Sequence, residues 1–370
     1  MKNKNRFFTI TILTFTFFII IAPMALAKTR SAYLIDYIYS NQGVSEDSGE
    51  LFGLSYEDTA QSLEILKYYN AFTIEGILGV ENKVDKVELS DYLEEELVDI
   101  FDSKTVLLYD VYNILKSLNL IDSSIGTALS VRIERYLNSS SHNSGGFSPI
   151  NTSNTRDLTS TFYAYKIYDL LGAEFPNSTI HKNWIFDCYN FDGGFGGNST
   201  LPSTILTTYY AIVLISELDD LDSLNTKSIT LDYLSSFYMD NEYDSLKYGG
   251  YLPATQSTYP LLSSTFLCTT AIDYINSARL NRTATVNWVI DRQNFQDGGF
   301  SDIFSLNNQE SSSIPGSYYA FKTLELFDAQ SSLNQNDFMV EFDFFVLLIV
   351  FSVFGALVIL AYVIWRKRKI

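Results

Sequence analysis

Apolar runs without charged residues lie near both ends of the 370-residue chain. The first run covers residues 7–21, follows Lys2, Lys4 and Arg6, and precedes Ala25-Leu26-Ala27. This pattern predicts a cleaved secretory signal over residues 1–27. The alternative is an uncleaved N-terminal anchor, for which the run is short.

The second apolar run, residues 344–365, is long enough to cross a bilayer as a helix. Four basic residues follow at once in the tail 366–370, and basic residues resist translocation. The alternative, a buried core helix, would not explain this basic stop. We therefore expect a single-pass type I protein of the cell membrane, with a linker over residues 329–343 and the main domain outside the cell.

A glycine pair followed by an aromatic residue recurs in the middle of the chain. The copies are Gly145-Gly146-Phe147, Gly193-Gly194-Phe195, Gly249-Gly250-Tyr251 and Gly298-Gly299-Phe300. Their first glycines are 48, 56 and 49 residues apart, about the size of a helical hairpin. Glycine permits positive φ and close approach at a turn, and the aromatic residue can fill the seam to a neighbouring hairpin. Hydroxyl residues open the helix that follows each pair, where they can accept from first-turn amides.

Two less regular units are expected upstream of the first glycine pair. Residues 57–69 have apolar positions near helical spacing, and residues 89–101 and 106–118 form a second helix pair. Each hairpin has two faces to bury and cannot do so alone, so the units are expected to stack. The total is about six hairpins, a number that can close into a ring. An N-terminal segment over residues 28–56 precedes them.

Two of the glycine motifs carry a family resemblance. The string from Arg292 to Phe300, Arg-Gln-Asn-Phe-Gln-Asp-Gly-Gly-Phe, resembles the repeat of the prenyltransferase and squalene-cyclase superfamily, which includes terpenoid cyclases and protein prenyltransferases. Residues 190–197, Asn-Phe-Asp-Gly-Gly-Phe-Gly-Gly, form a second good copy. The resemblance implies an all-α fold over residues 57–328, an (α/α)6 toroid of inner and outer helices around a central cavity.

The residues that carry the known chemistries of this superfamily are missing from their places. Where the resemblance would put a zinc-binding Asp-x-Cys pair, residues 199–205 and 254–260 contain neither Asp nor Cys. The two histidines, His142 and His181, lie on a loop and an outer helix, and Asp187-Cys188 is adjacent rather than spaced. Zinc needs about four converging ligands. We therefore expect no metal and no cofactor.

The other chemistries of the superfamily also lack their residues. Gly196-Gly197-Asn198-Ser199-Thr200 stands where diphosphate-binding Arg and Lys would fall. The acidic string at residues 219–222 has the wrong order for the cyclase Asp-x-Asp-Asp acid and is typical of a solvated turn. The thioester motif of complement-type toroids is absent as well. A shared fold does not carry a shared site.

Tyrosines recur at one place on the expected inner helices. These are Tyr163, Tyr210 and Tyr319, with Tyr109 and Tyr112 on an earlier helix. Core packing is one interpretation. The other is an aromatic-lined cavity that offers flat amphipathic rings to an apolar or sugar-like ligand.

Several acids are weak catalytic candidates. Asp58 and Asp110, with Glu57, could act as general acids if they point into an aromatic cavity, because burial there raises a carboxyl pKa. Asp192 and Asp297 more simply accept the amides of their own glycine turns. Gln293 is expected to cap in the same way.

The charge of the chain bears on its partners, and its two cysteines bear on a possible disulfide. Residues 28–343 carry 43 acidic and 18 basic residues, a charge of −25, which disfavours nucleic acid. Cys188 and Cys268 could form a disulfide outside the cell or remain two buried thiols. The partners expected are the membrane, through one C-terminal helix, and an apolar, glycan or protein ligand at the toroid mouth.

Two functional hypotheses follow. The first is a non-catalytic surface or binding module, favoured by the missing catalytic residues. The second is an enzyme of the superfamily that acts on an isoprenoid or another apolar substrate.

Overall fold

The structure is a computed structural model that describes residues 28–44, 50–75, 81–102, 106–150, 153–218, 221–294, 296–302 and 312–335. The chain separates into two compact units, residues 33–332 and residues 1–32 with 333–370. In the second unit, the Ser31 hydroxyl donates to Asn334 Oδ1 at 3.2 Å. The expected signal at residues 1–27 and the expected span at 344–365 lie outside the described residues. Among the helices that are described, none has the length and apolar character needed to cross a membrane.

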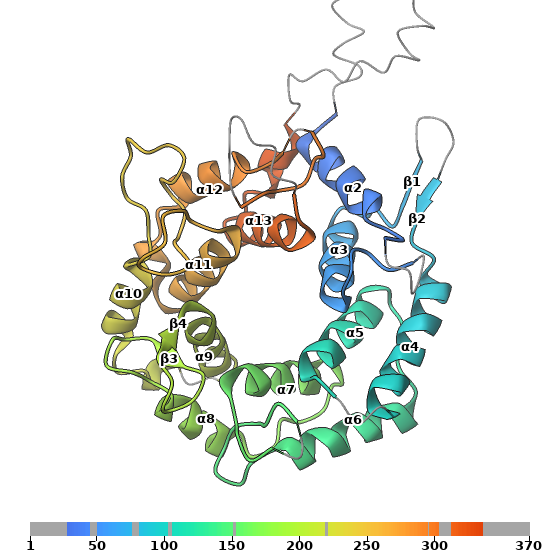
Figure 1. The fold of residues 1–370 in the computed structure, drawn as a ribbon, viewed down its shortest axis with the longest axis vertical. Coiled ribbons are helices and arrows are strands. Elements are labelled where there is room, and N and C mark those ends of the chain that lie inside the picture. Colours follow the sequence, from blue (N-terminus) through green and yellow to red (C-terminus); the bar gives the residue numbers. More distant parts are fainter. Residues whose placement is uncertain are drawn as a thin grey trace, which may run out of the picture. The chain divides into compact units, whose positions relative to one another are not determined.

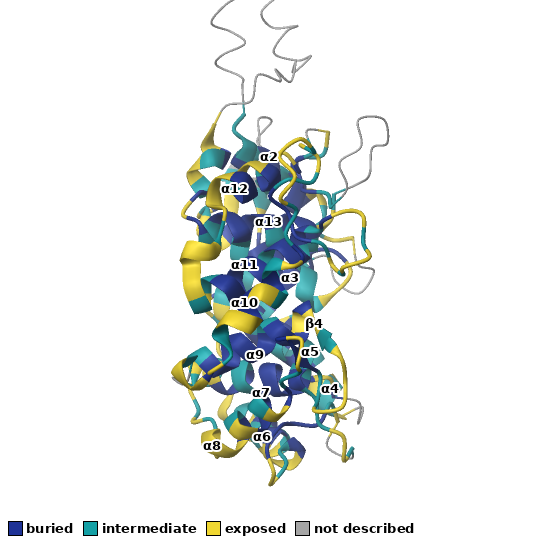
Figure 2. Ribbon diagram, turned by 90° about the vertical axis from the view of Figure 1, so that its left-hand side faces the viewer, coloured by how far each residue is buried: buried dark blue, intermediate teal, exposed yellow. Residues whose placement is uncertain are grey.

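Helices make up most of residues 33–332, in an inner and an outer layer (Figure 1). The inner layer holds α3 (Tyr56–Tyr68), α5 (Leu108–Leu120), α7 (Leu158–Leu170), α9 (Ile205–Glu217), α11 (Leu262–Asn276) and α13 (Ile314–Leu326). The outer layer holds α2 (Arg30–Ser40), which enters this unit at Tyr33, α4 (Lys86–Asp102), α6 (Thr127–Ser140), α8 (Ser178–Asp187), α10 (Lys227–Ser235) and α12 (Arg282–Ile290). Buried residues follow the inner helices, and exposed residues lie on outer helices such as α8 and α10 (Figure 2).

Short elements join these helices. The antiparallel strands β1 (Thr73–Glu75) and β2 (Glu81–Lys83) pair Thr73 with Lys83, and β3 (Phe195–Gly196) and β4 (Ser203–Thr204) pair Phe195 with Thr204. Three 3-10 turns, η1 (Leu221–Ser223), η2 (Ser277–Arg279) and η3 (Gln330–Asn334), complete the described elements.

The inner layer of this unit is a closed ring. Each inner helix contacts the next in chain order, and α13 contacts α3. The predicted toroid of six helical hairpins is therefore confirmed for the described part of residues 33–332. Helix α2 lies in the segment 28–56, where no helix was predicted, and it supplies the outer partner of α3.

The glycine turns connect neighbouring outer helices. Gly249 has φ +99°, and a Cβ built on it would lie 2.3 Å from the carbonyl oxygen of Ala284 on α12. Gly145, Gly193 and Gly298 approach α8, α10 and α2 in the same way. The contact of Gly298 with Tyr33 on α2 closes the outer layer. The first residue of each pair is glycine because a side chain would meet the backbone of the next outer helix, and a Cβ on the second would meet packed side chains, such as the Trp184 ring at Gly146.

The aromatic residue after each glycine pair is buried and tied to its inner helix. Its backbone N–H donates to a hydroxyl on that helix at 2.9–3.0 Å. The four bonds are Phe147 to Thr161, Phe195 to Thr208, Tyr251 to Thr265 and Phe300 to Ser317. These four hydroxyls therefore accept from the aromatic residue. The first-turn amides are capped by the residue just ahead of the helix, which is a hydroxyl residue as predicted before α9 (Thr204) and α13 (Ser313), and Asp157 before α7.

The same device occurs once without a glycine pair. The Phe52 N–H donates to Thr59 Oγ1 on α3 at 3.1 Å, and Phe52 is fully buried. Sequence analysis missed this copy because Leu51-Phe52-Gly53 places its glycine after the aromatic residue.

Alanine substitutions at three glycines separate the cost of positive φ from the cost of close packing. We expect Gly249→Ala to lower the free energy of unfolding by about 3 kcal/mol, because positive φ costs about 1–2 kcal/mol and overpacking adds about 1–3 kcal/mol. Gly172 has φ +63° but nothing within 4 Å of its Cβ position, so alanine there costs only about 1 kcal/mol. Gly126 has neither constraint and serves as the control. Urea unfolding followed by circular dichroism measures all three, and equal losses at Gly249 and Gly172 would contradict the packing argument.

Candidate functional site

Aromatic side chains contact one another from helix to helix along the inner layer. The rings of Tyr109 and Tyr112 on α5 lie 5.2 and 5.4 Å from that of Tyr163 on α7, between centroids. Tyr163 continues to Tyr210 on α9, with its hydroxyl 3.0 Å from the Tyr210 hydroxyl. Edge-on and tilted contacts at these distances are favourable for aromatic pairs. The structure thus brings together four of the five tyrosines singled out by the sequence.

The contacts continue to the last inner helix. The ring of Tyr209 on α9 lies 5.9 Å from Phe266 on α11, which lies 5.7 Å from Tyr319 on α13. Phe162 stacks on Tyr210 at 4.2 Å, and Tyr318 contacts Tyr319 at 5.7 Å. We call this set the aromatic belt: Tyr109, Tyr112, Phe162, Tyr163, Tyr209, Tyr210, Phe266, Tyr318 and Tyr319.

The belt has buried and partly exposed members. Tyr163 and Tyr210 are 9% and 6% exposed and serve as core. Tyr109, Tyr112 and Tyr319 are half-buried and keep surface that a ligand could contact. Packing therefore accounts for Tyr163 and Tyr210, whereas ligand contact stays a prediction for Tyr109, Tyr112 and Tyr319.

Glu57, in the first turn of α3, contacts the belt at Tyr109. Its Oε2 accepts from the hydroxyl of Tyr109, and its Oε1 accepts from Gln61 Nε2 at 2.9 Å. Burial raises the pKa of Glu57, the neighbouring Asp58 charge raises it further, and Lys116 opposes both. Burial, followed by the Glu57 charge, raises the pKa of Tyr319. Glu57 therefore interacts with belt tyrosines on two inner helices, Tyr109 of α5 through a hydrogen bond and Tyr319 of α13 through its charge.

The other two candidate acids have different surroundings. Asp58 Oδ2 accepts from the Leu54 amide at 3.0 Å, and so holds the turn that leads into α3. Asp110 is half-buried in the first turn of α5, where burial raises its pKa. Its charge also contributes to the raised pKa of Tyr56, after burial and Glu96. Of these three acids, Glu57 is the one hydrogen-bonded to the belt.

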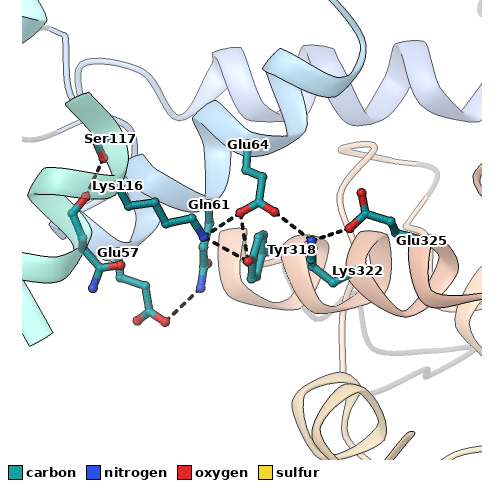
Figure 3. A network of polar contacts seen from close by, with 9 residues as sticks. Glu57, Gln61, Glu64, Lys116, Ser117, Tyr318, Lys322 and Glu325 are labelled. Atoms are coloured by element: carbon teal, nitrogen blue, oxygen red, sulfur yellow. Dashed lines mark hydrogen bonds and ion pairs between the residues drawn. The ribbon is translucent and has the colours of Figure 1, made fainter. Parts of the chain in front are cut away.

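A second charged group, the Glu64 network, joins the first, second and last inner helices (Figure 3). Glu64 on α3 pairs with Lys116 on α5 at 2.6 Å and with Lys322 on α13 at 2.8 Å. The Tyr318 hydroxyl donates to Glu64 at 3.0 Å, and Lys322 also pairs with Glu325. Burial alone would raise the pKa of Glu64, but the two lysines lower it to about 2. We define this network as Glu64, Lys116, Tyr318, Lys322 and Glu325.

Sequence analysis missed the Glu64 network. Glu57, Gln61 and Glu64 are spaced four and three residues apart, which places them on one face of α3. From that spacing, a polar face on this inner helix could have been predicted. The lysines gave no local signal, because they lie far away in the sequence.

The aspartates beside the glycine pairs hold their own loops. Asp192 Oδ1 accepts from the Gly194 amide at 3.0 Å and from the Ser203 hydroxyl at 2.7 Å. Asp297 accepts from the Gly299 amide at 3.1 Å. Gln293 Nε2 donates to the carbonyl of Gly298 at 3.0 Å. These contacts give the three side chains a local role at the turns.

The two histidines form hydrogen bonds within the fold, and the two cysteines are buried thiols. His181 is buried, its Nδ1 accepts from the Gly146 amide at 2.9 Å, and burial lowers its pKa to about 4. His142 Nε2 lies 2.7 Å from the Ser148 hydroxyl. Cys188 and Cys268 are free buried thiols, so the disulfide that the sequence allowed is not formed. No group of three or more His, Cys, Asp or Glu side chains within the described residues is placed to hold a metal ion.

A family comparison agrees with the toroid fold. The model of the prenyltransferase alpha-alpha toroid domain matches residues 78–182 and 152–342. The chain belongs to this prenyltransferase toroid family. No curated protein sequence matches it.

Three solved structures are similar to this chain to different degrees. Protein geranylgeranyltransferase-I of Candida albicans, complexed with GGPP, is 17% identical with a TM-score of 0.53, covering 85% of this chain and 88% of that one. A Tyr-to-Phe variant of the type II terpene cyclase MstE from Scytonema, in its apo form, is 8% identical with a TM-score of 0.47, covering 83% and 98%. A protein from Actinoplanes is 11% identical with a TM-score of 0.46, covering 83% and 99%. At 17% identity, the likeness to the Candida albicans enzyme concerns the fold alone.

Proposed function

We propose that this toroid is a membrane-tethered, extracellular binding module whose aromatic belt receives an apolar or amphipathic ligand. The observation that carries the proposal is the continuity of the belt, with ring contacts running across α5, α7, α9, α11 and α13. Aromatic side chains offer large contact areas to apolar chains at low entropic cost. Tethering is inferred from the uncharged residues 344–365 and the basic residues that follow them.

The charges of the inner layer also support binding over catalysis. Two lysines pair with Glu64 and keep its carboxyl ionised, so Glu64 has no proton to donate at neutral pH. The sequence lacks the zinc pair, the diphosphate-binding cations and the Asp-x-Asp-Asp acid at the expected places.

A second candidate function, acid catalysis on an isoprenoid, is favoured by one feature of Glu57. Its carboxyl is partly buried beside tyrosines, and burial raises its pKa. A carboxyl that stays protonated nearer neutral pH is a better general acid. In this reading Glu57 would donate its proton to an alkene or an epoxide.

One experiment tests both functions. The full chain, purified in amphipol, is incubated with farnesol; its melting temperature is measured, and the recovered compound is identified by mass spectrometry. We expect saturating farnesol to raise the melting temperature by about 3 °C or more and to be recovered unchanged. Tyr319→Ala is expected to abolish most of the shift, whereas alanine at the fully exposed Tyr243 leaves it intact.

The outcomes separate the alternatives. A cyclised or rearranged product that disappears in Glu57→Gln would replace binding by catalysis. The absence of any shift, or an equal shift in Tyr319→Ala, would rule out the belt as the ligand site.

A further inference from the structure

Two glutamates on the same face of α3 have opposite electrostatic surroundings. Glu64 pairs with two lysines at 2.6 and 2.8 Å. Glu57, two turns earlier, forms no ion pair with any Lys, Arg or His in the described part of the chain, and its two hydrogen bonds come from neutral groups. Lys116 is the nearby cation that influences Glu57, but its ammonium is bound to Glu64. A carboxylate that is half-buried without a counterion is costly unless a cation or a proton joins it.

A buried acceptor next to Glu57 also lacks a partner. Gln61 is only 3% exposed, and its Nε2 must face Glu57, since an amide oxygen would repel the carboxylate. That orientation leaves Gln61 Oε1 buried without a hydrogen-bond donor in the described residues. Buried polar atoms without partners are uncommon in folded proteins. The site therefore has spare acceptors, on Glu57 and on Gln61, and needs a donor.

The walls around these acceptors are aromatic. Tyr109 contacts Glu57 directly, and Tyr112 and Tyr319 keep exposed ring surface in the same belt. Ring faces attract cations within about 6 Å. Rings of this belt already do so inside the protein, since the Lys116 ammonium lies 6.0 Å from the Tyr112 centroid and 5.0 Å from that of Tyr318.

We propose that Glu57, Gln61 and the partly exposed tyrosines Tyr109, Tyr112 and Tyr319 form a site for the protonated amine of an alkylammonium compound. The inference rests on the proposed binding function and specifies the ligand's head group. The ammonium donates to Glu57 and to Gln61 Oε1, the rings surround its charge, and the alkyl chain lies along the belt. The acidic body, with a charge of −25 over residues 28–343, attracts such a cation.

Hexylamine and its neutral isostere 1-hexanol test this site. Hexylamine is protonated at pH 7, like a lysine side chain. Binding to the full chain in amphipol is measured by isothermal titration calorimetry at pH 7. We expect hexylammonium to bind about tenfold more tightly than 1-hexanol.

Charge-matched variants locate the preference. In Glu57→Gln the ratio of affinities should fall to about one through loss of ammonium binding, with 1-hexanol affinity retained. Glu95→Gln, an exposed residue of α4, removes the same charge and should keep the full ratio. An intact ratio in Glu57→Gln, or an equal loss in Glu95→Gln, would overturn the proposal.

The remaining outcomes separate this inference from the function on which it rests. Equal affinities of the two compounds for the unchanged protein would end the ammonium site but leave apolar binding. Binding of neither compound would overturn both. If phosphatidylethanolamine vesicles, and not phosphatidylglycerol vesicles, compete with hexylammonium, the amine belongs to a lipid head group; without such competition it belongs to a soluble amine.

Discussion

Replacing Phe195 by alanine should lower the free energy of unfolding by about 3–5 kcal/mol, the usual cost of removing a buried phenylalanine. Phe195 is fully buried after the second glycine pair, 5.4 Å from the ring of Tyr189. Its amide is also bound to Thr208, which fixes the loop to α9. The ring therefore fills the seam between a glycine turn and its inner helix, and alanine would leave a cavity there.

Phe191 supplies the matched control, four residues earlier in the same loop. Its side chain is fully exposed, at 106% relative exposure, so alanine there should change the unfolding free energy by no more than about 0.5 kcal/mol. Guanidinium unfolding of both variants measures the difference. Similar losses at the two positions would mean that the aromatic residue of the motif does not hold the hairpin together.

Replacing Glu64 by alanine should be as severe, at about 3–5 kcal/mol, because it leaves the mostly buried Lys116 ammonium without its carboxylate and leaves Lys322 with Glu325 alone. The side chains of Lys116 and Lys322 are 17% and 22% exposed. Asp122 is the matched control, since it also bridges two lysines, Lys67 and Lys86, but it is itself 70% exposed. Alanine at Asp122 should have a much smaller effect, because solvent screens exposed pairs. Equal effects in chemical unfolding would contradict a buried role for the Glu64 network.

The same network predicts how stability depends on pH. The folded-state pKa of Glu64 is lowered to about 2 from the ordinary 4.5, so the stability that it contributes is present above about pH 4.5 and is lost as the pH falls toward 2. The difference in unfolding free energy between the unchanged protein and Glu64→Ala should therefore shrink over that range. A constant difference from pH 7 to pH 2.5 would show that Glu64 is not held ionised by its lysines.

Sequence reasoning reached the hairpins and the ring because their causes are local. A glycine pair, an aromatic residue and a hydroxyl lie within about twenty residues of one another, and the structure uses them together in each copy. Helical periodicity located α3, α4 and α5 without that motif. The recurring tyrosines also pointed to the inner layer, since their positions in successive helices are equivalent.

Sequence reasoning did not reach the contacts that close the ring. Lys322 and Glu64 are 258 residues apart, and Tyr318 and Lys116 are 202 apart, with no motif that links the members of either pair. Helix α2 was missed for a similar reason, as its contact with Gly298 depends on the far end of the repeat domain.

The sequence by itself determined the repeating helical hairpin, its glycine turns and the apolar end segments, because backbone sterics and hydrophobic periodicity act over a few residues. Only the tertiary structure decided which glutamate of α3 forms ion pairs with lysines and which has only neutral hydrogen-bond donors. Glu57 and Glu64 share one helix and one face. Their partners come from α5 and α13, and a charge interacts with whatever the closed ring places within a few ångströms.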